Sequence, residues 1–179
     1  MLKDIVKPGD WLVYFPTKKD WLDKIILGAT FSKTNHASMI KDSETVFETD
    51  GDLFKARFTP ISEAEQKHVL IIRPKELQGK TLEVYAAMKK YKGAPYGYWD
   101  IAMHGLFFWL AAPIRKKVVS ALGAKHFMVC SELVARITYD VTGREELEDY
   151  EGITPADLIT IAKEYPEAYE IVAAFNGTR

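Results

Sequence analysis

The chain has 179 residues, the size of a single domain, with 47% hydrophobic and 27% charged residues, which is an ordinary globular composition. The formal net charge is −1, so bulk charge gives no support for nucleic-acid binding, and the sequence shows neither a basic arm nor an acidic tail. A single cysteine, Cys130, cannot form a disulfide within the chain. The N-terminus lacks the apolar run of a signal peptide, and we expect a cytoplasmic protein without a transmembrane segment, with a phage-encoded or exported origin left open.

The first half of the sequence has the composition and turn signals of β-strands. Short apolar, β-branched or aromatic runs alternate with polar or Gly/Pro-containing turns, which predicts an antiparallel sheet. The turn "KDSE" is expected to join two of the runs into a hairpin. A helix is expected around "DWLDKIILGAT" (Asp20–Thr30), between the first two strands. The expected strands are Trp11–Phe15, His36–Ile40, Thr45–Thr49, Leu53–Phe58 and His68–Arg73.

The second half has the spacing of amphipathic helices. Gly143 is a plausible end signal for one of them, and Thr154 with Pro155 is a start signal for another. The predicted class is therefore α+β, with an antiparallel sheet from the first half covered by helices from the second. The expected helical segments are Leu77–Tyr91, Tyr98–Leu122 (broken or kinked at Pro113), Cys130–Gly143 and Thr154–Tyr165.

Cys130 opens the helical pattern "CSELVARITYDVTG" after a short apolar lead. In the first turn of a helix, free backbone N–H groups and the positive end of the helix dipole favour the thiolate form of a cysteine, which is the nucleophile. The other interpretation is a small buried hydrophobic residue, because a lone cysteine in an apolar context usually has that role. From its position alone, the structural role of Cys130 is the commoner one.

A catalytic cysteine needs an imidazole as proton acceptor, and the chain has four histidines. His36 begins a predicted strand, where alternation places it on one face with Ser38 and Ile40. His126 lies four residues before Cys130 in an extended lead, on the same side as the cysteine. Spacing alone does not choose between His36 and His126.

Glu48 is the candidate that would orient the imidazole of His36. It interrupts the apolar run "TVFET" on the strand expected to pair with the strand of His36. A half-buried carboxylate beside an imidazole fixes its tautomer and stabilises its charged form. The alternative is an ordinary carboxylate at the rim of the sheet.

Five short segments together resemble a known enzyme family over about residues 7–160. "VCSELV" is similar to the nucleophile segment of NlpC-type papain-fold cysteine peptidases, and "GAPYGYWD" to the segment that precedes it there. "KPGDWLVYF", "NHASMIKD" and "VFETDGD" resemble its first strand, its histidine strand and the strand with its third polar residue. Here the histidine strand precedes the cysteine helix. That is the order of the circularly permuted branch, which includes the YiiX-like proteins and the lecithin–retinol acyltransferase-like enzymes.

The resemblance implies a papain-like, permuted NlpC-type domain over residues 1–179, with an antiparallel sheet packed against helices and a helical insertion at about 98–125. It also implies the roles of the site residues. Cys130 would be the nucleophile, His36 the base and Glu48 the residue that orients the base, which leaves His126 as a neighbour. Tyr96 would lie by the nucleophile and assist the oxyanion hole together with the Cys130 backbone N–H. Such a site needs no metal and no cofactor.

The sequence departs from the family pattern on both sides of the site. Glu132 stands where the ordinary nucleophile motif has a glycine, although the YiiX-like branch tends to have S-E-L there. Trp99 and Asp100 replace a Gly-Gly pair, and a long insertion separates them from Cys130. These departures mean that the substrate cannot be copied from the peptidoglycan peptidases of the family.

The insertion carries the most apolar stretch of the chain, Ile101–Ile114, which is too short to span a bilayer. This apolar stretch predicts a buried helix. The alternative is that it forms an acyl-chain groove or a surface that faces a membrane. We expect it to form one wall of the cleft, with Trp99, His104 and His126 as substrate-binding residues. His104 can equally be a core histidine with a satisfied ring.

The residues and the resemblance together predict a cysteine hydrolase that cleaves an amide, ester or thioester through an acyl-enzyme. One alternative is a lipid acyltransferase or deacylase of the same fold, which the apolar stretch indicates. A second is a non-catalytic papain-like binding or structural module, for which the departures leave room. The expected partner is a small peptide, amide or acyl-lipid substrate, with contact to a membrane surface left open and no nucleic acid.

Overall fold

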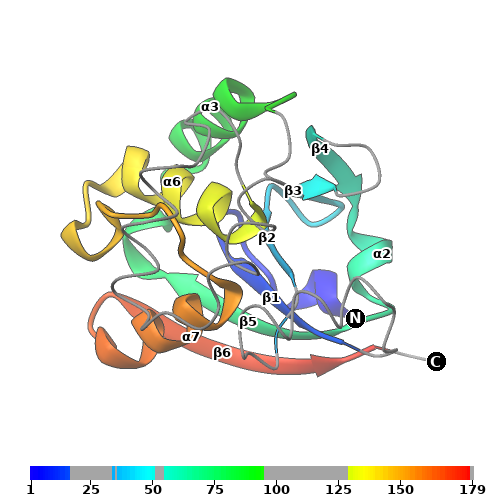
Figure 1. The fold of residues 1–179 in the computed structure, drawn as a ribbon. Coiled ribbons are helices and arrows are strands. Elements are labelled where there is room, and N and C mark those ends of the chain that lie inside the picture. The colour runs from blue at the N-terminus through cyan, green and yellow to red at the C-terminus, as the bar shows by residue number, and fades with distance from the viewer. Residues whose placement is uncertain (17–33, 35, 51–54, 95–128, 178–179) are drawn as a thin grey trace, which may run out of the picture.

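The computed structural model describes residues 1–16, 34, 36–50, 55–94 and 129–177. Here the chain is an α+β protein with helices packed on a six-stranded antiparallel sheet (Figure 1). The strands are β1 (Trp11–Phe15), β2 (His36–Ile40), β3 (Thr45–Asp50), β4 (Lys55–Pro60), β5 (His68–Pro74) and β6 (Tyr169–Asn176). The helices are α2 (Ile61–Ala64), α3 (Thr81–Tyr91), α6 (Cys130–Thr142) and α7 (Pro155–Glu164), with short 3-10 helices at Leu2–Asp4, Lys75–Leu77 and Glu145–Leu147.

Two predicted helical regions lie outside the described residues, namely Asp20–Thr30 and Tyr98–Leu122, and so does the insertion at about 98–125. The helices predicted at Leu77–Tyr91, Cys130–Gly143 and Thr154–Tyr165 are confirmed as α3, α6 and α7. Within the described ranges, no helix combines the length and the apolar character that crossing a membrane requires.

The strand order is β4-β3-β2-β1-β5-β6, with every neighbouring pair antiparallel. The five strands predicted in the first half are present, but the prediction that the sheet comes from the first half alone is wrong. The C-terminal strand β6 pairs with β5 along its whole length. Its sequence "YEIVAAFN" lacks apolar–polar alternation, so its periodicity does not separate a strand from a helix. Its backbone pairing with β5 is what determines that this segment is a strand.

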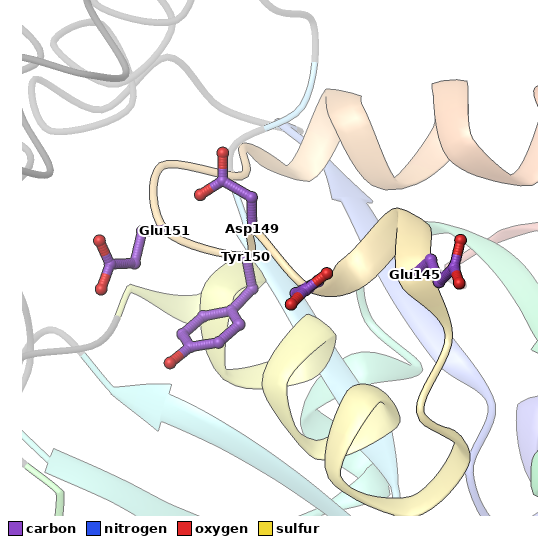
Figure 2. Close-up of a pocket in the computed structure, with 5 residues that line it drawn as sticks. Glu145, Asp149, Tyr150 and Glu151 are labelled. Carbon is purple, nitrogen blue, oxygen red and sulfur yellow. The ribbon is translucent and has the colours of Figure 1, made fainter.

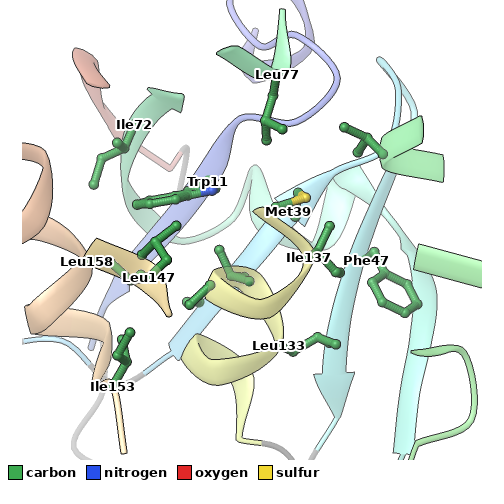
Figure 3. Close-up of a cluster of buried hydrophobic side chains, with 14 of the residues drawn as sticks. Trp11, Met39, Phe47, Ile72, Leu77, Leu133, Ile137, Leu147, Ile153 and Leu158 are labelled. Carbon is green, nitrogen blue, oxygen red and sulfur yellow. The ribbon is translucent and has the colours of Figure 1, made fainter. Parts of the chain in front are cut away.

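Both faces of the sheet are covered, and the alternation of β1 assigns the two cores. Trp11 and Val13 point into a large cluster with apolar residues of α3, α6 and α7 (Figure 3). Leu12 and Tyr14 point into a smaller cluster on the other face, closed by Leu2 and by Ile61 of α2. Helices α3, α6 and α7 therefore cover one face of the sheet, and the N-terminal segment with α2 covers the other.

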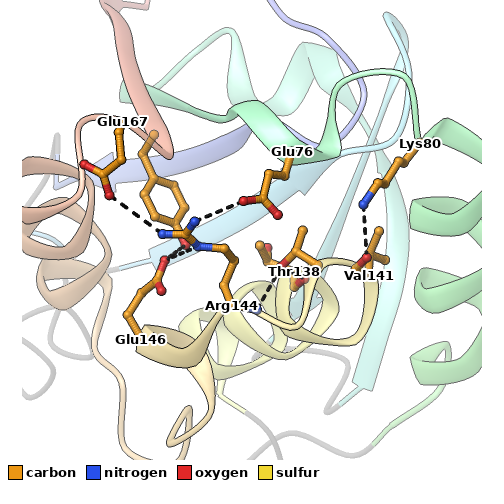
Figure 4. Close-up of polar contacts among 9 residues, drawn as sticks. Glu76, Lys80, Thr138, Val141, Arg144, Glu146 and Glu167 are labelled. Atoms are coloured by element: carbon orange, nitrogen blue, oxygen red, sulfur yellow. Dashed lines mark hydrogen bonds and ion pairs between the residues drawn. The ribbon is translucent and has the colours of Figure 1, made fainter.

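Arg144, just after the C-terminal end of α6, forms ion pairs with three segments of the chain. Arg144 follows Gly143, which ends α6 with a left-handed φ of 69° as the sequence predicts. The Arg144 guanidinium lies 2.7 Å from Glu146, 3.0 Å from Glu76 and 3.8 Å from Glu167 (Figure 4). The contacts join the 3-10 helix after α6 to the segments that follow β5 and α7.

A buried ion pair anchors the central strands to the N-terminal segment. Asp10 is fully buried just before β1. Its carboxylate accepts hydrogen bonds from Arg73 Nε at 2.9 Å and from Arg73 Nη2 at 2.7 Å, at the end of β5. Arg73 Nη2 also donates to the Ile5 carbonyl at 3.0 Å, and the Lys7 N–H donates to Asp10 at 2.8 Å. The pair thus fixes β1, β5 and residues 5–10 relative to one another.

We predict that Asp10→Ala destabilises the protein by about 3–5 kcal/mol, because it leaves the Arg73 guanidinium buried without its counter-ion. The free energy of unfolding from urea denaturation measures this. The matched control is Lys90→Ala, which breaks the exposed Lys90–Asp140 pair and should cost under about 1 kcal/mol. Equal losses in the two variants would contradict the anchoring role of Asp10.

Candidate active site

His36 and Glu48 meet across the second and third strands of the sheet. His36 is the first residue of β2 and Glu48 lies in β3. Register pairs between the two strands end at Met39 and Phe47, so the side chains connect the strands beyond that point. His36 Nε2 lies 2.7 Å from Glu48 Oε2. The side chains are 21% and 11% exposed, so solvent screens this contact only in part.

The other carboxylate oxygen of Glu48 is held by Thr59, which lies on β4. Thr59 Oγ1 donates a hydrogen bond to Glu48 Oε1 at 2.7 Å, and Thr59 is buried. Burial alone would raise the pKa of Glu48, but the bonds to His36 and Thr59 and nearby positive charge lower it to about 2. Glu48 is therefore a carboxylate at neutral pH, with both oxygens engaged.

Cys130 is the first residue of α6, and this helix packs across β2 and β3. Cys130 is 5% exposed. The apolar face of the helix, with Leu133, Val134 and Ile137, is fully buried in the larger core. This packing brings the start of α6 to the strands that carry His36 and Glu48.

Two polar residues hold the first turn of α6. Glu132 Oε2 accepts the backbone N–H of Val129 at 3.1 Å, and its Oε1 accepts the N–H of Gly152 at 2.6 Å. Ser131 Oγ donates to the carbonyl of Ile153 at 2.6 Å. Glu132 is the residue that departs from the ordinary family motif. Its buried carboxylate connects the first turn of α6 to the loop before α7 through these two hydrogen bonds.

The pKa of His36 shows how its surroundings act on the ring. Burial alone would lower the pKa of His36, but the charge of Cys130 and its hydrogen bond to the ring, followed by the bond and charge of Glu48, raise the pKa of His36 to about 10. Because Glu48 engages Nε2, Nδ1 is the ring nitrogen that a second partner could use. The raised pKa favours the imidazolium form of His36 in its ion pair with Glu48.

The first turn of α6 also supplies hydrogen-bond donors beside the sulfur. The N–H groups of Cys130 and Ser131 have no acceptor within the helix, since their i−4 carbonyls precede it. They lie at the positive end of the helix dipole. Such groups stabilise an oxyanion when a carbonyl carbon is attacked next to them.

The structure brings two of the predicted site residues into contact, namely His36 and Glu48. Cys130 begins the helix that packs on the strands of these two residues. The remaining ones lie outside the described residues: Tyr96, Trp99, His104 and His126. Thr59 also belongs to this site, although no local sequence pattern indicates it. The hairpin register could have indicated it, because Glu48 pairs with Arg57 and the next residue on the same face is Thr59.

An open pocket of about 400 Å³ lies in the loop that follows α6 (Figure 2). The loop adjoins the cysteine turn, since Gly152 and Ile153 bind Glu132 and Ser131. None of the three candidate residues lines the pocket, so we assign it no role in the chemistry. Its lining residues are Glu145, Glu148, Asp149, Tyr150 and Glu151.

Comparison with known proteins relates this chain to solved structures by fold. No protein-family model matches the chain, and no curated protein matches its sequence. Its fold is similar to the crystal structure of the metalloprotein YiiX from Escherichia coli O157:H7, with a TM-score of 0.54 and 16% identity over 97% of this chain and 89% of that chain. Among the residues described for this chain, no three His, Cys, Asp or Glu side chains gather as a metal site would require. The shared feature is the YiiX-like α+β fold.

Proposed function

We propose that this protein is a cysteine hydrolase that cleaves an amide, ester or thioester through an acyl-enzyme on Cys130. The observation that carries the proposal is the His36 ring, with Nε2 bonded to Glu48, on strands against which the Cys130 helix packs. A cysteine nucleophile, an imidazole base and an orienting acceptor are the three parts that such chemistry needs.

In the proposed mechanism, the Cys130 proton has passed to His36 Nδ1 before substrate binds, and the Cys130 thiolate attacks the substrate carbonyl carbon. The resulting oxyanion is stabilised by the first-turn N–H groups of α6, with Tyr96 as the expected additional donor. The carbon–leaving-group bond then breaks, and the proton on His36 passes to the leaving group. Water, deprotonated by His36, releases the acyl group from the sulfur and regenerates the thiolate and the imidazolium.

Glu48 keeps the ring aligned during these transfers. As a carboxylate with both oxygens engaged, it holds the Nε2 proton and stabilises the imidazolium that forms when Nδ1 is protonated. The lowered pKa of Glu48 means that the carboxylate stays charged as His36 changes protonation state. A protonated Glu48 could not stabilise the imidazolium in this way.

The order of the site residues along the chain supports a permuted papain-like version of the fold. His36 and Glu48 lie on neighbouring strands that both precede the Cys130 helix in the sequence. The similarity to YiiX in fold agrees with the YiiX-like branch that the sequence motifs resemble. We therefore propose the permuted NlpC-type arrangement as the origin of this site.

The proposal predicts that Cys130 reacts with iodoacetamide at neutral pH and forms an acyl adduct with an activated substrate. We expect His36→Gln to slow alkylation by at least about tenfold, because the imidazole no longer promotes the thiolate. The substrates to be compared are a p-nitrophenyl ester, an acyl thioester, a peptide amide and a phospholipid. With at least one of them, we expect intact-mass spectra to show an acyl group on Cys130. The panel identifies the bond class and tests the acyl-lipid alternative.

The controls for this experiment are Cys130→Ser, which should form no adduct, and His68→Gln. His68 is an exposed histidine at the start of β5, so its substitution should leave the alkylation rate unchanged. A wild-type rate that equals the His36→Gln rate, with no acyl adduct from any substrate, would favour a non-catalytic protein.

The ion pair also predicts how stability depends on pH. Glu48 has a lowered pKa, so its contribution is complete above its ordinary value of 4.5 and is lost as the pH falls toward about 2. His36 has a raised pKa, so its contribution is complete below its ordinary value of 6.5 and is lost as the pH rises toward about 10. The loss of unfolding free energy in Glu48→Gln should therefore be largest between pH 4.5 and 6.5 and smaller on both sides.

Urea denaturation of the wild type and of Glu48→Gln at a series of pH values measures this difference. The matched control is Glu44→Gln, in the exposed turn between β2 and β3, which should give a small difference with little pH dependence. A Glu48→Gln difference that is constant over the whole pH range would show that no charged pair forms.

A further inference from the structure

The ring of Tyr14 lies directly beside the imidazole of His36. Tyr14 on β1 is the register partner of His36 on β2, so both side chains leave the same face of the sheet. Their ring centroids are 5.0 Å apart and their planes meet at 43°. At this separation and tilt, aromatic rings attract one another beyond the effect of buried area. Tyr14 thus supports one side of the imidazole.

A buried hydrogen bond fixes the Tyr14 ring in turn. Its hydroxyl lies 2.8 Å from Ser38 Oγ, and Ser38 is fully buried two residues after His36 on the same strand. Lys67 Nζ lies 5.2 Å from the centroid of the Tyr14 ring. The Tyr14 ring is therefore tied to the strand that carries His36 and cannot turn without leaving a buried hydroxyl unpaired.

Packing alone does not require these two hydroxyl groups. The other core side chains on this face are apolar and include Leu12, Ile40 and Val69. A phenylalanine and an alanine would fill the same positions without burying two hydroxyls. Burial, together with the nearby charges of Glu48 and Cys130, raises the pKa of Tyr14, so the phenol stays uncharged beside the ion pair. The hydroxyl pair thus fixes an orientation beside the candidate site.

We propose that Tyr14 is a positioning residue of this site, whose ring, held by the bond to Ser38, keeps the His36 imidazole aligned between Glu48 and Cys130. Its effect on reactivity rests on the proposed function. Its effect on the ring of His36 does not, because the charge state of that ring can be measured whether or not the protein is an enzyme.

The test compares Tyr14→Leu, which removes the ring, with Tyr14→Phe and Ser38→Ala, which remove only the hydrogen bond. Two readouts are used, the rate of Cys130 alkylation by iodoacetamide across pH and the titration of the His36 ring followed by NMR. We expect Tyr14→Leu to slow alkylation at neutral pH by about two- to tenfold, the range that such a ring contact contributes. The titration midpoint of His36 should also move toward its ordinary value.

The two single hydroxyl variants should show smaller and similar effects. The double variant Tyr14→Phe/Ser38→Ala should be no worse than either one, because both substitutions remove the same bond. This double variant keeps the proposal testable if Tyr14→Leu does not fold.

The matched controls are Tyr169→Leu and Tyr169→Phe. Tyr169 lies against Trp11 with the same centroid separation of 5.0 Å and the same angle of 43°, and its hydroxyl donates to Glu146. We expect these variants to lose stability without changing either readout. Folded Tyr14→Leu with the wild-type alkylation profile and His36 titration would overturn the proposal, and so would equal changes in Tyr169→Leu. If His36→Gln does not slow alkylation, the proposed function fails, while the His36 titration still decides the role of Tyr14.

Discussion

The packing of α6 against β2 and β3 is the constraint on which the candidate site depends. Leu133 and Ile137 are fully buried among core residues that include Met39 and Phe47 of these strands. Burying a side chain of this size stabilises a protein by about 1.5–3 kcal/mol. Because Cys130 begins the same helix, the apolar contacts of α6 also determine where the sulfur lies relative to His36. The position of Cys130 at the start of the helix is therefore set by the packing of residues farther along it.

Buried carboxylates connect this packing to the polar site. Asp10 fixes the N-terminal segment against β1 and β5, Glu132 holds the cysteine turn, and Glu48 holds the imidazole. Both oxygens of each carboxylate accept hydrogen bonds from described groups. A buried carboxylate with its partners in place restricts local geometry, whereas an unpaired one would destabilise the fold. The protein thus uses buried charge where backbone or ring orientation must be held.

Much of the fold and part of the site could be predicted from the sequence. Runs of β-branched and aromatic residues between turn signals predicted β1 to β5, with β4 displaced by two residues, and Gly143 correctly marked the end of α6. The strand β6 could not be predicted, because an apolar run with two alanines becomes a strand only through its pairing with β5. The choice of His36 over His126 came from motif order, since spacing left both open. Thr59 and Tyr14 act through cross-strand neighbours, so their roles follow from register and not from local pattern.

In the proposed function, the His36 imidazole held by Glu48 promotes the thiolate form of Cys130. The ultraviolet absorbance of the thiolate, taken as the difference between the wild type and Cys130→Ser, tests this claim most directly. We predict a thiolate signal in the wild type at neutral pH that is lost in His36→Gln. No thiolate signal in the wild type at neutral pH, or an equal signal in His36→Gln, would contradict the claim.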